Sequence, residues 1–187
     1  MPQFSTRRRV RHSAADMFDL VADVERYPEF VPLCRSLRVL RRTKQDGREI
    51  VVAEMTIAYK LIRETFTSRV TLERDRLHIL VEYLDGPFSR MENRWHFRPI
   101  EADGASAAGE DAARKEVARK VAARKDAACE VAAREDAACE IEFFIAYEFR
   151  SRTFGLLMGA LFDTAFRRFA AAFERRADQV FGKVSPA

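Results

Sequence analysis

The chain has 187 residues, of which 48% are apolar and 15 are phenylalanine, and its net charge at pH 7 is +4. This length and composition suit one globular domain with a large apolar core. No run of about 18 apolar residues predicts a membrane-spanning helix, and no signal-peptide pattern is present. We therefore expect a soluble protein.

Three cysteines, an odd number, show neither a C-x-x-C motif nor a Cys/His spacing. This pattern excludes a disulfide framework and a zinc site, and it indicates a reducing compartment. The small positive charge permits contact with nucleic acid or an anionic membrane without requiring it. We interpret the densest basic cluster (Arg7, Arg8, Arg9 and Arg11) as the exposed side of an edge strand, with a phosphate-binding patch as the alternative.

The N-terminal region predicts one strand and two short helices. Residues Gln3–Val10 have strand character, and Ser13 is suited to cap the helix that follows. Pro28 and Pro32 bracket a second, short helical turn that is richer in apolar residues than a solvated loop needs. The apolar face of the first helix consists of Met17, Phe18, Val21 and Ala22.

From Ser36 onward, apolar residues recur at every second position, which predicts a series of strands. Gln45–Gly47 and Asp85–Pro87 carry turn residues between them. Successive hairpins make an antiparallel sheet of six to seven strands when Gln3–Val10 is included. The strands after Ser36 are expected at Ser36–Arg42, Arg48–Tyr59, Leu61–Asp75, Leu77–Leu84, Phe88–Ile100 and Cys139–Arg150.

The same alternation assigns side chains to the two faces of the sheet. The inner face is expected to be apolar and the outer face polar. Inward positions are Val51, Ala53, Met55, Ile57, Tyr59, Phe66, Val70, Leu72, Met91, Trp95, Phe97, Ile141, Phe143, Ile145, Tyr147 and Phe149. Outward positions are Thr65, Thr67, Arg69, Thr71, Glu92, Arg94, His96 and Arg98.

Residues Arg152–Gly182 predict a long helix on which the rest of the chain packs. A helix of about 28 residues is roughly 42 Å long, so it needs a broad apolar surface, which a curved sheet supplies. Gly155 and Gly159 either allow close packing against a strand or leave room for a ligand. The apolar face contains Phe154, Phe162, Phe166, Phe169, Phe173 and Phe181, widened by Met158, Leu161 and Ala165.

Residues 103–138 interrupt this pattern with alanine-rich pentapeptides: DAARK, EVARK, VAARK, DAACE, VAARE and DAACE. A five-residue period spreads alanines and charges around a helix and leaves no stripe to bury. We expect a single domain over residues 1–187, with this insertion in the hairpin before the last strand. The insertion is either a marginal exposed helix or disordered, with a partner-binding helix as the alternative. Deletion of Ala105–Ala137 should leave folding and ligand binding intact.

The sequence shows no motif of a catalytic or metal-binding site. P-loop, G-x-G-x-x-G, G-x-S-x-G and H-E-x-x-H patterns are all lacking. His96 is expected on the surface, and Glu54, Glu64 and Glu82 on exposed sheet faces. We therefore expect no enzyme, no catalytic residue and no metal.

An antiparallel sheet wrapped on a helix leaves space for a cavity, which the inward side chains would make apolar. Such a pocket binds its ligand through apolar contacts and a few polar groups. Ordinary core packing is the alternative role for each candidate. The candidate ligand-binding residues are Tyr27, Phe30, Val31, Met55, Ile57, Phe66, Trp95, Phe97, Phe143, Ile145, Tyr147, Met158, Leu161, Phe162 and Phe166.

Several segments of the chain resemble one family. Tyr27–Cys34 reads YPEFVPLC and resembles the YPxFVPxC signature of the coenzyme Q-binding proteins of the START superfamily. The resemblance covers nearly the whole chain except the alanine-rich array, in the expected order. Each motif is modest alone, and together they are highly specific. The further segments are Glu64–Ser68, Asp85–Phe88, Trp95–Pro99, Glu142–Ser151 and Ala172–Arg176.

The resemblance implies an α+β helix-grip fold, in which a curved antiparallel sheet grips a C-terminal helix and two short helices follow the first strand. It implies non-enzymatic binding of ubiquinone or a similar isoprenoid lipid, as ligand and not as cofactor, in support of respiratory electron transport. Tyr27, Tyr59 or Tyr147 would meet the carbonyl groups of the quinone, and Tyr27–Leu33 would be a gate that contacts a membrane surface transiently. The expected location is the cytoplasm, with peripheral contact at the inner membrane.

The same resemblance carries two other functions. Some bacterial members are called RatA-type toxins, said to block ribosomal subunit association, and others are labelled polyketide cyclase/dehydrase-like. The alternative function is therefore a ribosome-binding inhibitor whose partner is the large ribosomal subunit, and the basic N-terminal strand is its support. A cyclase or aromatase is a third hypothesis and needs an inward acid or base. The pattern sets neither the tail length of the ligand nor the oligomeric state.

Overall fold

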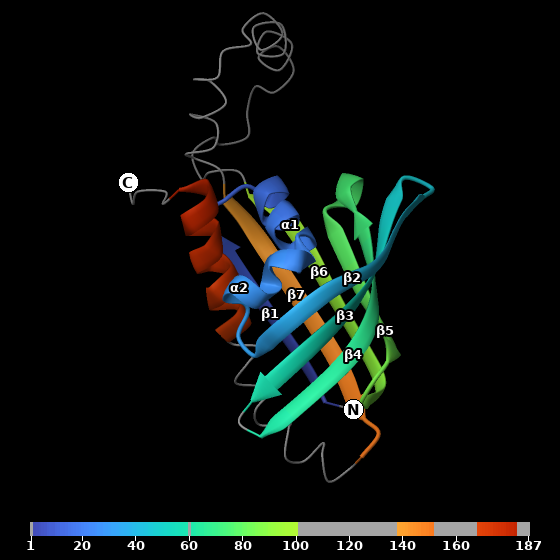
Figure 1. Ribbon diagram of the computed structural model, residues 1–187. Helices are drawn as coiled ribbons and strands as arrows, with labels where there is room; N and C mark the ends of the chain where they lie inside the picture. The colour runs from blue at the N-terminus through green and yellow to red at the C-terminus, as the bar shows by residue number, and fades with distance from the viewer. Residues whose placement is uncertain (1, 60, 101–137, 152–167, 183–187) are drawn as a thin grey trace, which may run out of the picture.

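The structure is a computed structural model that describes residues 2–59, 61–100, 138–151 and 168–182. One antiparallel sheet carries helices on one side (Figure 1). The elements are β1 (Gln3–Val10), α1 (Ala14–Ala22), η1 (Val24–Arg26), α2 (Tyr27–Phe30), β2 (Cys34–Gln45), β3 (Arg48–Tyr59), β4 (Ile62–Glu73), η2 (Arg74–Arg76), β5 (His78–Asp85), β6 (Phe88–Ile100) and β7 (Ala138–Phe149). A C-terminal helix follows over residues 168–181.

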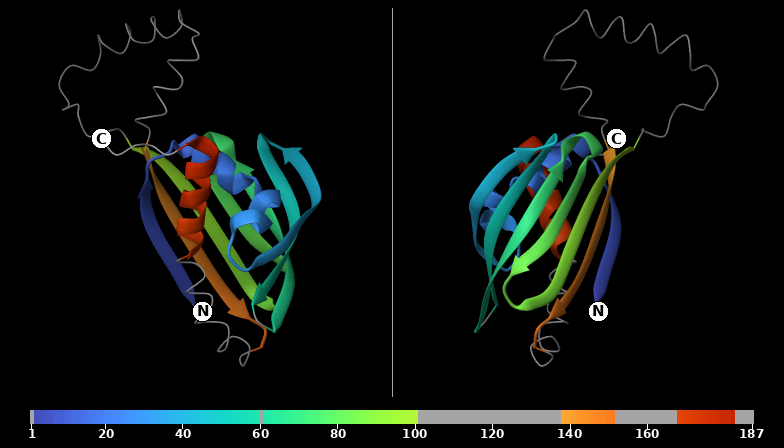
Figure 2. Two further views of the ribbon diagram at one scale, coloured as in Figure 1. Left: turned by 60° about the vertical axis from the view of Figure 1, so that its left-hand side comes forward. Right: turned by 90° about the vertical axis from the view of Figure 1, so that its right-hand side faces the viewer.

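The sheet has seven strands in the order β1-β7-β6-β5-β4-β3-β2, and every neighbouring pair is antiparallel. The first and last strands are neighbours, paired from Gln3↔Ala146 to Val10↔Cys139. The sheet curves around α1, α2 and the C-terminal helix, which all lie on its concave side (Figure 2). This arrangement confirms the expected helix-grip fold.

Alternation along the strands separates an apolar concave face from a polar convex face. On β3, Val51 and Ala53 are buried, whereas Glu54 points to the convex side and binds Arg38 of β2 at 3.1 Å. Arg69 and Glu82 form a similar pair between β4 and β5, at 2.9 Å. The predicted outward positions of Glu54 and Glu82 are thus confirmed, and the core lies on the concave side.

Helix α1 covers one end of the concave face. Ser13 caps it, because its Oγ accepts a hydrogen bond from the backbone N–H of Asp16 at 3.0 Å. Met17, Phe18 and Val21 are fully buried, as their spacing predicts. The Phe18 ring meets the Phe97 ring edge-on at 6.0 Å, and this contact fixes α1 against β6.

The C-terminal helix lies across β1 and β7, next to α2. Its Phe173 and Ala177 are buried against the sheet, and Gly182, with φ +90°, ends it as predicted. Phe181 was expected on the apolar face but is 38% exposed, because it is the last helical residue. The earlier part of the expected helix, residues 152–167, lies outside the described residues.

Ion pairs join the basic N-terminal strand to its neighbours. Arg7 binds Glu142 of β7 at 2.8 Å, and Arg8 binds Glu174 of the C-terminal helix at 3.3 Å. These pairs favour the edge-strand interpretation of the cluster over a phosphate-binding patch. The insertion lies outside the described residues up to position 137, and β7 begins at Ala138, inside the last DAACE unit as expected.

Candidate functional site

A cavity of about 140 Å³ lies between the concave face of the sheet, α2 and the C-terminal helix. An apolar cavity of about 150 Å³ stays dry and binds a molecule such as benzene. The cavity therefore matches one ring and is smaller than the roughly 300–1,000 Å³ that encloses a whole drug-sized ligand. It is lined by Val21, Val24, Tyr27, Val31, Pro32, Cys34, Leu37, Ala53, Met55, Ile57, Phe66, Ser68, Val70, Ile79, Val81, Phe88, Met91, Asn93, Trp95, Phe143, Ile145, Tyr147, Phe169 and Phe173.

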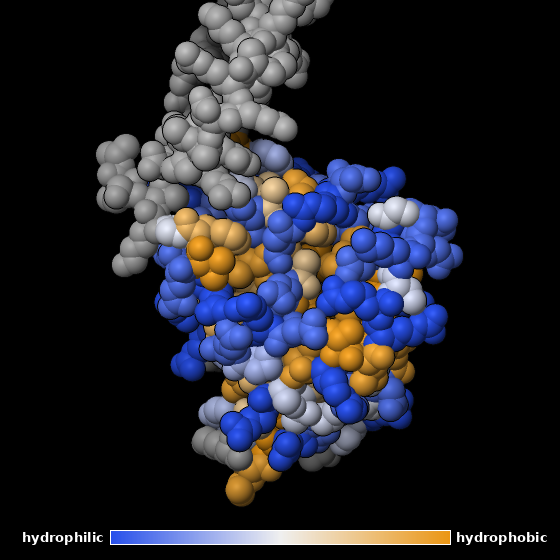
Figure 3. Space-filling view, turned by 45° about the horizontal axis from the view of Figure 1, so that its top comes forward, coloured by the Kyte–Doolittle hydropathy of each residue, from blue (hydrophilic) through white to orange (hydrophobic). Residues whose placement is uncertain are grey.

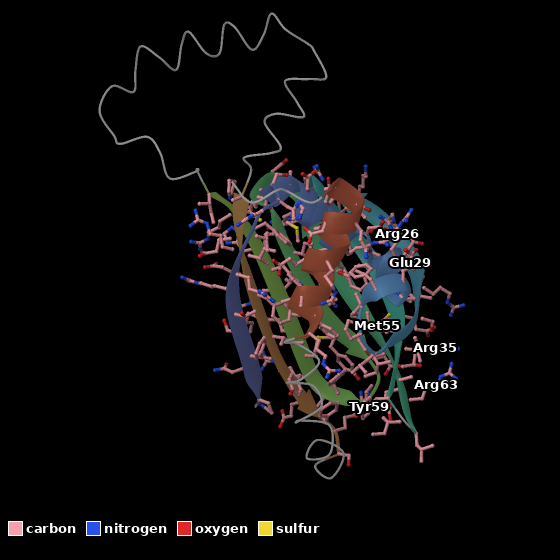
Figure 4. The ribbon with its side chains drawn as sticks, turned by 90° about the vertical axis from the view of Figure 1, so that its left-hand side faces the viewer. Arg26, Glu29, Arg35, Met55, Tyr59 and Arg63 are labelled. Carbon is pink, nitrogen blue, oxygen red and sulfur yellow. The ribbon has the colours of Figure 1, made fainter. Side chains whose placement is uncertain are left out.

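Burial of the lining residues distinguishes a floor from a mouth. Residues on β6 and β7, such as Trp95 and Tyr147, are buried and form the floor. Pro32, Met55 and Ile57 are among the half-buried lining residues, and we infer that the mouth lies beside them, at the α2–β2 connection and the end of β3. Figure 4 shows Met55 at this side of the sheet.

Aromatic rings form one wall of the cavity. The ring of Trp95 lies 4.5 Å from that of Phe143 and 5.3 Å from that of Phe173, both at steep angles. Phe66, on the other side, is held by the edge-on ring of Phe88 at 5.6 Å. A Cβ at Gly86 would lie 2.7 Å from the Cβ of Phe66, so only glycine allows the β5–β6 turn to approach Phe66 this closely. These rings suit a flat aromatic or quinonoid group.

Besides the tyrosines and Cys34, two polar side chains lie in the lining, and the sequence analysis missed both. Asn93 lies between Val81 and Ile145 in the sheet, and its Oδ1 is buried without a hydrogen-bond partner among the described residues. Ser68 is buried on β4. The signal was present in the sequence, because Asn93 falls between Met91 and Trp95 at the inward period of β6. A carboxamide oxygen left unpaired in an apolar cavity is suited to accept a hydrogen bond from a ligand.

The three tyrosines expected near a ligand head group have different surroundings. The hydroxyl of Tyr27 donates a hydrogen bond to the backbone carbonyl of Val21 at 2.5 Å, and burial raises its pKa far above the usual range. It therefore holds α2 to α1. Tyr147 lies in the cavity floor, whereas Tyr59 lies outside the lining at the end of β3.

Cys34 places a thiol in the cavity lining at the start of β2. Its Sγ lies 3.8 Å from the backbone oxygen of Ser36. Burial raises the pKa of the Cys34 thiol to about 11, so the thiol is protonated at neutral pH. Because the thiolate is the reactive form, Cys34 is a weak nucleophile there.

The structure brings most of the predicted candidates together. Phe30 does not line the cavity, because it packs outside it against Phe173 at 5.1 Å and under the Arg176 guanidinium at 5.5 Å. Phe97 does not line it either, because α1 covers it. Met158, Leu161, Phe162 and Phe166 lie outside the described residues. The candidates in the lining are Tyr27, Val31, Met55, Ile57, Phe66, Trp95, Phe143, Ile145 and Tyr147, and their role in ligand binding stays a prediction.

Acidic and basic side chains lie away from the cavity. No Asp, Glu, His, Lys or Arg is among the described lining residues, and no group of metal-binding side chains occurs within the described ranges. His96 points to the convex face, as expected, 3.7 Å from Glu142. Glu64 was expected on an exposed face, but it is half-buried on the concave side, opposite Ile57, because it shares the inward period of Phe66.

Comparison with known proteins shows which family this chain resembles in sequence. Residues 10–174 match the family described as polyketide cyclase / dehydrase and lipid transport. The chain is 30% identical to the "Ribosome association toxin RatA" of Vibrio cholerae over 98% of this chain and 100% of that protein. It is 25% identical to the mitochondrial "Coenzyme Q-binding protein COQ10 homolog B" of Xenopus laevis, over 97% of this chain and 60% of that protein.

Solved structures agree on the fold. The solution structure of an 18 kDa protein from Caulobacter crescentus is 26% identical, with a TM-score of 0.66, and the match covers 98% of this chain and 100% of that one. A START superfamily protein from Mycobacterium smegmatis is 18% identical, also with a TM-score of 0.66, over 95% of this chain and 98% of that one. The second likeness concerns the fold alone.

Proposed function

Because the chain belongs to the polyketide cyclase / dehydrase and lipid transport family, we propose that it binds ubiquinone or a similar isoprenoid lipid in the apolar cavity. The observation that carries this proposal is a ring-sized cavity with an aromatic wall and one unpaired carboxamide oxygen, the Oδ1 of Asn93. The binding that we propose is non-enzymatic, and the names of the Vibrio and Xenopus relatives support this.

The cavity volume fixes how such a ligand would lie. A space of about 140 Å³ takes the ring but not a polyprenyl chain. The tail therefore runs out through the mouth, past Pro32, Met55 and Ile57. Each methylene that it buries there contributes about 0.8 kcal/mol, so the mouth supplies much of the affinity.

The polar ring substituents meet Asn93. The unpaired Oδ1 of Asn93 is an acceptor, so it would accept a hydrogen bond from a quinol hydroxyl. A quinone carbonyl would need the Nδ2 donor of the same amide. The ring lies against Trp95 and Phe143, whose centroids are 4.5 Å apart. The name of the Xenopus relative, a coenzyme Q-binding protein, supports a quinone as the ligand. The role that follows is support of respiratory electron transport, from the cytoplasm and at the inner membrane surface.

Trp95 makes the proposal testable without a label. It is the single tryptophan of the chain and lies in the cavity floor, so a bound quinone will quench the intrinsic fluorescence. We expect saturable quenching by a short-tailed ubiquinone, and isoprenoid quinone in organic extracts of protein purified from a quinone-producing host. Absence of both would refute quinone binding.

A second candidate function rests on the Vibrio relative, which is named a ribosome association toxin. The convex face carries three arginines that are about half exposed or more: Arg7 and Arg98, which both pair with Glu142, and Arg94, which pairs with Glu92. Such a face would bind ribosomal RNA in a salt-dependent way. Salt-sensitive co-sedimentation with the large ribosomal subunit would support this function, whereas normal subunit joining in excess protein would exclude it.

A further inference from the structure

The turn between β3 and β4 exposes apolar side chains to solvent. Leu61 is 102% exposed and Tyr59 is 38% exposed. The turn lies at the lower end of the sheet in Figure 1, on the side of α2. Figure 3 shows hydrophobic side chains at several places on this face, including a small group at its lower tip. A single exposed leucine is ordinary on a protein surface, so the meaning of Leu61 depends on the side chains around it.

This turn continues the apolar surface of the cavity mouth. Ala53, Met55 and Ile57 line the cavity along β3, and Tyr59 is the next residue on the same face. Ile62 lies opposite Tyr59 on β4. Ile57, Tyr59 and Ile62 therefore extend the apolar surface from the cavity to the tip of the hairpin, with the half-buried Glu64 opposite Ile57.

Positive charges flank the same tip. Arg35 and Arg63 are exposed, and neither forms an ion pair with any residue that the structure describes. They lie on opposite sides of the end of β3, where Ala58 pairs with Arg63 and bonds the Leu33 carbonyl at 2.9 Å. Figure 4 shows Arg35, Arg63 and Tyr59 on one side of the molecule. Glu64, the residue after Arg63, is acidic and half-buried.

We propose that the β3–β4 turn docks on an anionic lipid bilayer, with Leu61 and Tyr59 in the interface and Arg35 and Arg63 at the headgroups. Apolar side chains flanked by arginines are suited to this position, and tyrosine favours the boundary between water and lipid. RNA is a poorer partner, because a fully exposed leucine offers nothing to a phosphate backbone. Docking turns the cavity mouth toward the bilayer, so a lipid ligand enters along the path from Leu61 to Ile57.

The chain supplies a matched control on β2. Leu40 is 47% exposed, and the neighbouring Arg41 is exposed without an ion pair among the described residues. Arg41 pairs with Val52 in the sheet, far along β3 from Tyr59. The variants Leu61→Ser/Arg63→Glu and Leu40→Ser/Arg41→Glu thus remove the same groups and change the net charge equally.

The experiment is flotation with vesicles of phosphatidylcholine, with and without phosphatidylglycerol. Each charge near an anionic surface contributes about 1 kcal/mol, so Arg63→Glu, a change of two charges, lowers partitioning by roughly thirtyfold. We expect the wild type and the Leu40/Arg41 variant to float with the anionic vesicles, and the Leu61/Arg63 variant to stay behind. No flotation of the wild type, equal flotation of both variants, or equal binding to neutral vesicles would overturn the proposal.

Docking and ligand binding are separable in this design. The Leu61/Arg63 variant should still show quenching of Trp95 by a short-tailed ubiquinone, which needs no vesicle. Loss of flotation with normal quenching supports docking at this turn, whereas flotation without any quenching removes the proposed ligand and leaves docking intact. If the variant floats normally but loses co-sedimentation with ribosomes, the turn binds RNA and the membrane proposal is wrong.

Discussion

The side chains at both ends of the concave face are apolar, but different helices cover the two ends. At one end α1 lies on β5, β6 and β7, and Phe18 and Phe97 pack together there with 2% and 1% exposure. At the other end, beside α2, Met55 and Phe66 remain half-buried around a cavity of about 140 Å³. Strand alternation delivers apolar side chains to both ends. The covering element decides whether they become a packed core or a binding site.

The first prediction compares the loss of stability when one phenylalanine at each end is replaced by alanine. Phe97→Ala removes a ring that α1 encloses, so we expect the free energy of unfolding to fall by about 3–5 kcal/mol. Phe66→Ala enlarges a space that already exists around a half-buried ring, so a fall of about 1–2 kcal/mol is expected. Urea denaturation measures both. Equal losses would mean that the cavity end is packed as tightly as the α1 end.

The second prediction concerns a larger side chain introduced at each end of the concave face. Ala14→Met, at the start of α1, overpacks a closed core and should lower the free energy of unfolding by about 1–3 kcal/mol. Ala53→Met enters the cavity and should change stability by less than about 1 kcal/mol. It should also weaken short-tailed ubiquinone binding by about tenfold or more, read from Trp95 quenching. Full quenching with Ala53→Met would show that the ligand lies elsewhere.

The third prediction separates the stability of the cavity end from its binding. Asn93→Leu replaces an amide whose Oδ1 is buried without a partner among the described residues. An unsatisfied polar group costs about 1–3 kcal/mol, so the empty variant should be more stable by about 1 kcal/mol in thermal or urea unfolding. Quinone affinity should fall by about tenfold. A variant that is less stable, or that binds quinone normally, would show that Asn93 has a structural role.

The smallest expected effect is a difference in reactivity between two cysteine thiols, one at each end of the concave face. Burial raises the pKa of Cys34 to about 11 and that of Cys139 to about 12. In a Cys129→Ala background, iodoacetamide should label Cys34 slowly through the mouth and should hardly label Cys139. The rate of Cys34 labelling should rise about tenfold for each pH unit, because the thiolate is the reactive form. Added ubiquinone should protect Cys34. Faster labelling of Cys139 would place the opening at the α1 end.

The same raised pKa has a consequence for stability. The folded protein holds the Cys34 proton more tightly than the unfolded chain does, so this contribution is fully present below about pH 9, the ordinary value, and is lost as the pH rises toward 11. Urea denaturation across this range should show stability falling with pH. A Cys34→Ala variant should show a weaker dependence.

The sequence predicted the architecture because long stretches obey one period. Alternation on β3 placed Met55 and Ile57 in the lining correctly. The same rule could not separate Phe97 from Trp95, since both point inward and only α1, from a distant part of the chain, covers Phe97. Phe30 was expected in the lining but lies outside it for a similar reason, because its partners Phe173 and Arg176 lie on the C-terminal helix.

Polar members of the site were missed for another reason. An expectation that inward positions are apolar passes over Asn93 and Ser68, although both keep the inward period of their strands. Glu64 was assigned outward on its charge alone, against the period that it shares with Phe66. In each case the period predicted the position correctly, and the expectation from polarity was wrong. Polar residues at inward positions are therefore the ones to examine first for ligand recognition.

The pairing of Ile100 with Ala138 at the end of the β6–β7 hairpin has a practical use. Whatever joins these two residues starts and finishes at adjacent strands, so a change in its length adds little closure entropy and disturbs no register. The position therefore suits domain insertion. A fluorescent protein grafted between them would sit at the opposite end of the sheet from the β3–β4 turn. Such a fusion would carry a fluorescent reporter and leave the cavity mouth free.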